Sequence, residues 1–217
     1  MTRSHIAAEP SPPSLPSTSP VLIVPGWRNS GPGHWQHQWC AQLPQAVWVE
    51  QDDWLTPTRQ AWVDRLANTI AAQPRPVILV THSLGCITAA HLPPEAAAHV
   101  KAALLVAPAD PERRGQLADF APVPYRPLPY RSIVVASDND PFCPVRLATA
   151  YSRAWGSDLV KLVGAGHINV ESGHGHWPLG WGLLQALQQE SADPHPNTAH
   201  PYMHQTHIQT RTKSFEL

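Results

Sequence analysis

Short aliphatic runs alternate along this chain with segments of helical pattern, and this alternation limits the possible folds more than any other feature of the sequence. A run such as residues 77–80 carries apolar side chains at consecutive positions, which favours a strand buried on both faces of a sheet. By contrast, residues 58–72 place Trp62, Leu66 and Ile70 four apart, as one face of an amphipathic helix does. The chain is therefore expected to be an α/β protein.

The same two patterns recur along most of the chain. The expected strands are residues 21–24, 47–49, 77–80, 102–107, 132–136 and 159–163. The expected helices are residues 34–43, 58–72, 83–91, 144–155 and 182–189. Strands that alternate with helices predict a mostly parallel sheet, right-handed crossovers and helices on both faces, which is a three-layer sandwich.

The two ends of the chain differ from its centre. Residues 1–19 are rich in Ser and Pro and have few large apolar side chains, so they cannot bury enough surface to fold, and we expect disorder. Residues 191–217 carry His195, His200, His204 and His207 without a helical or strand period, and the same expectation applies. A single domain is predicted over residues 20–190, and the 42 % of hydrophobic residues in the chain supplies its core.

The bulk composition excludes several classes of partner. A formal net charge of −1 gives no basis for binding nucleic acid or an anionic membrane. No apolar run is long enough for a membrane span, and the N-terminal prolines argue against a secretory signal. The three cysteines, Cys40, Cys86 and Cys143, are an odd number at wide spacing and do not predict a disulfide framework. A cytoplasmic protein with a small-molecule substrate is expected, and the oligomeric state is left open.

The strand at 77–80 leads directly into Thr81-His82-Ser83-Leu84-Gly85, and a helical segment follows. This strand–turn–helix context is the one in which a nucleophilic serine is presented at the carboxyl end of a sheet. Gly85 suits so tight a turn, whereas Thr81 is larger than the glycine most common at that place. The Leu84 backbone N–H, at the positive end of the helix, is a candidate oxyanion donor. The alternative is that Ser83 only caps the helix.

A serine nucleophile needs a histidine base and an acid that orients the base, and in this fold the chain order is serine, acid, histidine. Two carboxylates, Asp138 and Asp140, follow the strand at 132–136, and we favour Asp140 because prolines stiffen its loop. The other aspartate is expected to make local turn bonds. After the last strand, glycines flank the loop that leads to His167, whose imidazole can accept and return the serine proton.

Three further positions complete the predicted site. The Trp27 backbone N–H, after the first strand, is the expected second oxyanion donor, and a purely structural turn is the alternative. His34, Trp35 and His82 are candidate lining residues of a substrate pocket, although Trp35 could instead pack a helix on the sheet.

Other chemistries fit the sequence poorly. Histidines 167, 174 and 176 cluster near one loop, but a zinc site needs three or four rigidly held ligands, and we predict no metal. Gly31 and Gly33 follow a strand, yet no phosphate-binding motif surrounds them, so no nucleotide cofactor is expected.

Several longer blocks of sequence resemble one known family. They are Pro25-Gly26-Trp27, the stretch from Ser30 to Gln36, Thr81 to Gly85, Asp140-Pro141-Phe142, Gly166 to Asn169, Glu171 to Gly173, and Trp177-Pro178. Over residues 20–188 the chain resembles the small serine hydrolases of the retinoblastoma-binding protein 9 and YdeN-like family, within the α/β-hydrolase superfamily. The resemblance implies a triad of Ser83, Asp140 and His167. It also implies a compact sheet without a large lid, which the modest segment between Ala107 and Ser132 fits.

Two hypotheses for function follow. The first is a serine hydrolase that cleaves a small ester or amide through an acyl-enzyme intermediate and needs no cofactor. The second is a protein-interaction module on a hydrolase scaffold, because a fold does not fix a function. The presence of all three triad residues favours the first hypothesis.

Overall fold

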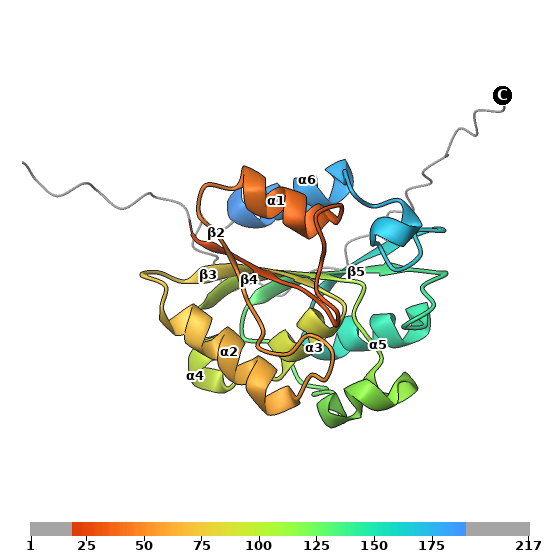
Figure 1. Cartoon of the computed structure of the whole chain (residues 1–217), viewed down its shortest axis with the longest axis horizontal. Helices are drawn as coiled ribbons and strands as arrows, with labels where there is room; N and C mark the ends of the chain where they lie inside the picture. The colour runs from red at the N-terminus through yellow and green to blue at the C-terminus, as the bar shows by residue number, and fades with distance from the viewer. Residues whose placement is uncertain (1–18, 190–217) are drawn as a thin grey trace, which may run out of the picture.

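The computed structural model describes residues 19–189, which form a parallel sheet covered by helices on both faces (Figure 1). The predictions of disorder for residues 1–18 and 191–217, including those for the tail histidines, lie outside the described residues. Helices α1 (Trp35–Gln42) and α6 (Pro178–Gln189) lie on one face of the sheet. The other helices lie on the opposite face: α2 (Arg59–Ala71), α3 (Leu84–Ala90), α4 (Pro94–Ala97) and α5 (Val145–Trp155).

The sheet has six strands in the order β2-β1-β3-β4-β5-β6, and every pairing is parallel. The strands are β1 (Val21–Val24), β2 (Ala46–Trp48), β3 (Val77–His82), β4 (Val100–Val106), β5 (Arg131–Ser137) and β6 (Asp158–Leu162). The chain moves outward from β1 to β2 and then crosses back to β3 on the other side of β1. Ligands of such sheets bind at the carboxyl ends of the strands where the order reverses. The loop after β1 and the turn after β3 therefore meet at the expected place for a site.

All the predicted strands and helices are present, with ends that differ by a few residues. The largest difference is α6, which begins at Pro178 rather than at residue 182. Proline is favoured in the first turn of a helix. A Cβ at Gly180 would lie 2.2 Å from the Trp177 ring, so this glycine allows the ring to pack closely against the helix. The short helix α4 and the 3₁₀ helices η1 (Pro111–Arg113), η2 (Gly115–Phe120) and η3 (Val170–Ser172) had not been predicted.

Consecutive side chains of a buried strand enter opposite cores. Leu22 and Val24 of β1 pack with α2, α3 and α5, whereas Val21 and Ile23 pack with α1 and α6. The second core is rich in tryptophan: Trp35 lies 4.6 Å from Trp39 and 5.1 Å from Trp177, between ring centroids. Because both faces are covered, the strands read as continuous aliphatic runs.

The turn after β3 packs directly on the end of β1. A Cβ at Gly85 would lie 2.4 Å from the Val24 carbonyl oxygen and 2.7 Å from that of Pro25. We expect Gly85→Ala to lower the free energy of unfolding by about 3 kcal/mol or more, because backbone of the central sheet would have to move. Urea denaturation measures the change.

Gly182→Ala is the matched control for this substitution. Gly182 lies in α6, and a Cβ there would have no heavy atom within 4 Å. Alanine has the higher helix propensity, so this variant should be more stable by about 0.5–1 kcal/mol. Equal unfolding midpoints for Gly85→Ala and the wild type would contradict the packing argument.

Within residues 19–189, none of the helices combines the length and the apolar character that crossing a membrane requires. The segment between β4 and β5, residues 107–130, contains only the short helices η1 and η2 and forms no large lid.

Candidate active site

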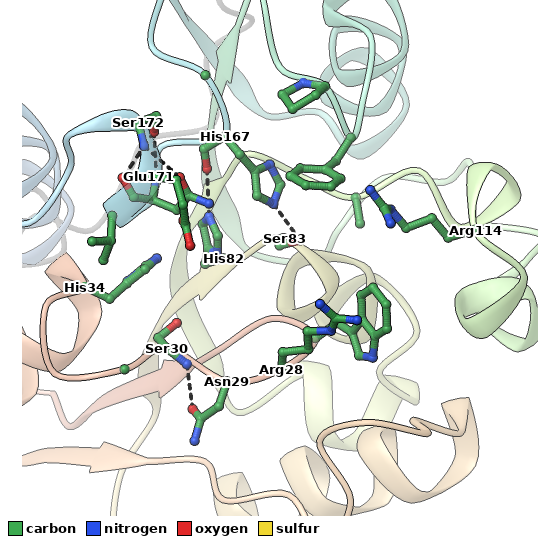
Figure 2. Close-up of a pocket in the computed structure, with 18 of the residues that line it drawn as sticks. Arg28, Asn29, Ser30, His34, His82, Ser83, Arg114, His167, Glu171 and Ser172 are labelled. Atoms are coloured by element: carbon green, nitrogen blue, oxygen red, sulfur yellow. Dashed lines mark hydrogen bonds between the residues drawn. The ribbon is translucent and has the colours of Figure 1, made fainter.

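Ser83 lies in the sharp turn between β3 and α3. Its φ of 53° is in the left-handed region, which is strained for a residue with a Cβ and is typical of functional turns. Its side chain makes no capping hydrogen bond to α3. Instead, Ser83 Oγ lies 2.9 Å from Nε2 of His167 (Figure 2). The geometry thus differs from that of a serine that caps a helix.

Two close backbone contacts and a buried threonine hold this turn. A Cβ at Gly26 would lie 2.7 Å from Ser83 Cβ, so the chain after β1 passes directly against the serine. Gly85 is pressed against the end of β1 as described above. Thr81 fits despite its size, because its hydroxyl lies 3.0 Å from Cys86 Sγ and 3.3 Å from the Leu104 carbonyl oxygen.

His167 joins Ser83 to a carboxylate. Its Nδ1 lies 3.0 and 2.9 Å from the two carboxylate oxygens of Asp140, and both side chains are buried, at 8 % and 3 % exposure. Asp140 also accepts a hydrogen bond of 2.8 Å from the Phe142 backbone N–H. Asp138 makes a different contact and accepts a 2.8 Å hydrogen bond from the Gly164 N–H. Of the two candidate acids, only Asp140 contacts the histidine.

Polar side chains after β5 hold the histidine loop. Asn139 Oδ1 accepts a 2.7 Å hydrogen bond from the Gly166 N–H, and Ser137 Oγ accepts one of 3.0 Å from Ala165. Gly164 and Gly166 have positive φ values of 68° and 55°. Ser137 and Asn139 were not predicted as site residues, although their position beside Asp140 at the end of a strand was a usable signal.

Two further histidines lie beside His167. The His82 ring lies 4.8 Å from that of His167, and its Nε2–H donates a 2.9 Å hydrogen bond to the His167 carbonyl oxygen. His34 caps α1, because its Nδ1 accepts a hydrogen bond from the Gln36 N–H. Burial, with repulsion from His167, lowers the pKa of His34 to about 3 and the pKa of His82 well below 6.5. Both imidazoles are therefore neutral at pH 7.

Trp35, predicted as a possible pocket residue, is buried in the core, and that prediction is wrong. Its indole N–H donates a 2.8 Å hydrogen bond to the Ile168 carbonyl oxygen, and its ring packs on Trp39 and Trp177. The residue before it, His34, lines the cleft; it is the N-cap of α1 and has extended backbone angles. Trp35 thus helps to position the histidine loop from the core between α1, α6 and the sheet.

The two predicted oxyanion donors flank Ser83. Trp27 follows Gly26, and Leu84 is the first residue of α3, where an N–H has no intrahelical partner. Within residues 19–189, neither backbone N–H donates a hydrogen bond to the protein. Both groups are thus available to an oxygen atom placed above the serine.

A cleft of about 740 Å³ opens over Ser83. Figure 2 shows Arg28 and Arg114 on one side of the serine, and His34, His82 and Glu171 on the other. The rim also includes Phe142, whose ring lies 4.4 Å from that of His167. Within the described part of the chain, no group of three or more metal-ligating side chains is close enough to hold an ion.

The lowered pKa of His34 predicts a loss of stability in acid. The unfolded chain, with a pKa near 6.5, binds more protons than the folded one down to about pH 3, so stability falls as the pH drops through that interval. The His34→Asn variant keeps a side chain that can cap α1. Between pH 7.5 and pH 5, we expect its free energy of unfolding to fall by about 2 kcal/mol less than that of the wild type. Urea unfolding at the two pH values measures this difference.

His99→Asn is the control, because His99 is exposed. It should follow the wild type at both pH values. An unchanged pH dependence in His34→Asn would show that burial of this imidazole does not set the acid sensitivity.

The chain is similar to known serine hydrolases in sequence and in structure. The family model described as serine hydrolase matches residues 21–186. A YdeN-like hydrolase from Pectobacterium atrosepticum is 31 % identical, with a TM-score of 0.74 over 80 % of this chain and 92 % of that one. The ydeN gene product from B. subtilis is 21 % identical, with a TM-score of 0.67 over 78 % and 98 % of the two chains.

More distant structures share the fold. Thermogutta terrifontis esterase 2 is 16 % identical, with a TM-score of 0.56 over 80 % of this chain and 81 % of that one. Among curated proteins, no significant relative was found.

Proposed function

Since the chain belongs to the serine hydrolase family, among the YdeN-like α/β-hydrolases, we propose that it cleaves a small ester or amide through an acyl-enzyme intermediate. In this proposal Ser83 is the nucleophile, His167 is the general base and Asp140 orients the base. We assign the activity to a single domain of residues 20–190.

One observation carries the proposal. Ser83 Oγ, the His167 imidazole and the Asp140 carboxylate form a continuous series of contacts of 2.9 to 3.0 Å. A carboxylate at Nδ1 keeps the proton on that nitrogen, which leaves the Nε2 lone pair directed at the serine hydroxyl. The burial of both partners strengthens this arrangement, since water does not screen it.

The reaction then proceeds in two halves. Ser83 Oγ attacks the carbonyl carbon while its proton passes to His167 Nε2, and the carbonyl oxygen becomes an oxyanion. The N–H groups of Trp27 and Leu84 stabilise that charge, together with the N-terminus of α3. His167 returns the proton to the leaving alcohol or amine. Water, activated by the same imidazole, then releases the acid and restores Ser83.

The cleft agrees with a small substrate. Its volume of about 740 Å³ falls within the range of small-molecule sites. The short segment between β4 and β5 contributes Leu117 and Arg114 to the rim. A compact acyl or alcohol group can therefore reach Ser83 from solvent without the opening of a large lid.

Reaction with a fluorophosphonate probe tests the proposal. The full chain should be labelled, and mass spectrometry should place the adduct on Ser83. A panel of short acyl esters and aminoacyl amides then distinguishes between the two substrate classes. Absence of both labelling and turnover in a well-folded sample would favour the protein-interaction hypothesis instead.

A further inference from the structure

Two arginines at one side of the cleft are held in place by aromatic rings. The Arg28 guanidinium lies 4.3 Å from the Trp27 ring centroid. The Arg114 guanidinium lies 4.5 Å from the Phe142 ring and 5.9 Å from that of Trp27. A guanidinium that lies over a ring keeps its N–H groups in its own plane, where they are free to bind a ligand.

Neither arginine has an anionic partner within residues 19–189. Other arginines of the described chain have one: Arg65 pairs with Asp52, Arg113 with Asp110 and Arg131 with Asp158. Asp110 lies near Arg114 along the chain, but its carboxylate contacts Arg113 Nε at 3.5 Å and the Glu112 N–H at 3.1 Å. The cleft thus has two cationic groups on one side that the protein itself leaves without a counter-charge.

The loop that carries Arg28 is fixed in an unusual conformation. Arg28 and Asn29 have φ values of 70° and 67°, which are strained for residues other than glycine. The Arg28 N–H donates a 3.0 Å hydrogen bond to the Trp54 carbonyl oxygen, and the Asn29 N–H donates one of 3.1 Å to Gly26. These bonds fix the backbone from which the Arg28 side chain extends over the Trp27 ring at the rim of the cleft.

The rings that hold the arginines also border the reacting groups. Phe142 lies against His167, with ring centroids 4.4 Å apart. Trp27 directly follows Gly26, whose backbone lies against Ser83. Figure 2 shows Glu171 on the opposite side of the serine, and the other carboxylate that lines the cleft, Asp110, is paired with Arg113.

We propose that Arg28 and Arg114 form a subsite for a carboxylate of the substrate, close to the bond that Ser83 attacks. This inference rests on the hydrolase function proposed above and narrows it to esters or amides that carry a negative charge. Charge-assisted hydrogen bonds from guanidinium groups to carboxylate are short and can be bidentate, which gives the subsite both affinity and orientation.

Matched pairs of esters test the subsite. The first pair places the charge on the acyl side: the 4-nitrophenyl monoester of glutaric acid against 4-nitrophenyl valerate. The second places it on the leaving group: the butyrate ester of 4-hydroxyphenylacetic acid against that of its methyl ester. In at least one pair, the wild type should prefer the charged member by about tenfold in kcat/KM, and added salt should reduce that preference.

Arg28→Gln and Arg114→Gln should each lower this preference severalfold. The ratio of the two esters is measured on the same sample, so a partly unfolded variant still gives a valid ratio. Arg153→Gln is the control, because it removes the same charge from an exposed position in the last turn of α5. It should keep the wild-type ratio.

The outcomes separate the two proposals. Hydrolysis of the uncharged esters with a ratio near one in both pairs, or with a ratio that neither arginine variant changes, would overturn the subsite and leave the hydrolase function standing. Failure to hydrolyse any of the four esters, together with a lack of fluorophosphonate labelling, would overturn the hydrolase function and the subsite with it.

Discussion

Ser83→Ala is expected to lower kcat/KM for ester or amide substrates by about 10⁴-fold or more, to a level close to background. The variant loses the only atom that can form the acyl-enzyme in the proposed mechanism, while the neighbouring groups keep their places. Ser83 Oγ makes no capping bond, so removing it should not weaken α3. Steady-state kinetics and loss of fluorophosphonate labelling both measure the effect, and circular dichroism checks the fold.

Ser152→Ala provides a matched control for the loss of a hydroxyl group. Ser152 is buried in α5, and its Oγ donates a 2.9 Å hydrogen bond to the Ser157 carbonyl oxygen. Its removal should lower stability by about 1 kcal/mol and leave turnover intact. Substantial activity or labelling in Ser83→Ala would mean that another residue is the nucleophile.

Asp140→Asn is expected to reduce kcat by about 10³–10⁴-fold with little change in fold. The asparagine carbonyl can still accept the hydrogen bond from the Phe142 N–H. Its amide group, however, would donate to His167 Nδ1 and so move the imidazole proton to Nε2. A protonated Nε2 cannot accept the serine proton, which removes general-base catalysis.

Asp138→Asn distinguishes the two candidate acids. Asp138 bonds to the Gly164 N–H, and the asparagine carbonyl oxygen can keep that bond. Its kcat should therefore stay within about threefold of the wild type, as expected for a local turn contact. If Asp138→Asn were instead the inactive variant and Asp140→Asn the active one, the assignment of Asp140 as the acid would be wrong.

Much of this fold could be predicted from sequence because its strands are buried on both faces. Residues 77–80 and 133–136 are aliphatic at every position for that reason, and few other structures produce such runs. The start of α6 was predicted at residue 182 rather than at Pro178, and Gly180 lowers the helix propensity of the turn between them. The contact of Gly180 with the Trp177 ring explains why a glycine stands there.

The residues of the candidate site that directly follow strands could be predicted from the sequence. Those whose position depends on side-chain packing were harder to predict. Ser83, Asp140 and His167 each come after a strand of a parallel sheet, so the topology brings them to one edge. Trp35 was predicted either to line the cleft or to pack a helix on the sheet, because so short a helix does not reveal which of its sides faces the sheet. Arg28 and Arg114 were not singled out, since only the folded chain brings Arg114 to Phe142 and both arginines to the same cleft.

The layer formed by α1 and α6 has a consequence for synthesis. These helices come from opposite ends of the domain and together cover one face of the sheet (Figure 1). A growing polypeptide can assemble the sheet and the helices of the other face while α6 is still inside the ribosome. Until α6 emerges, the aliphatic side chains beneath it face water. The nascent chain thus exposes an apolar surface of the kind that chaperones recognise until α6 has emerged and packed on the sheet.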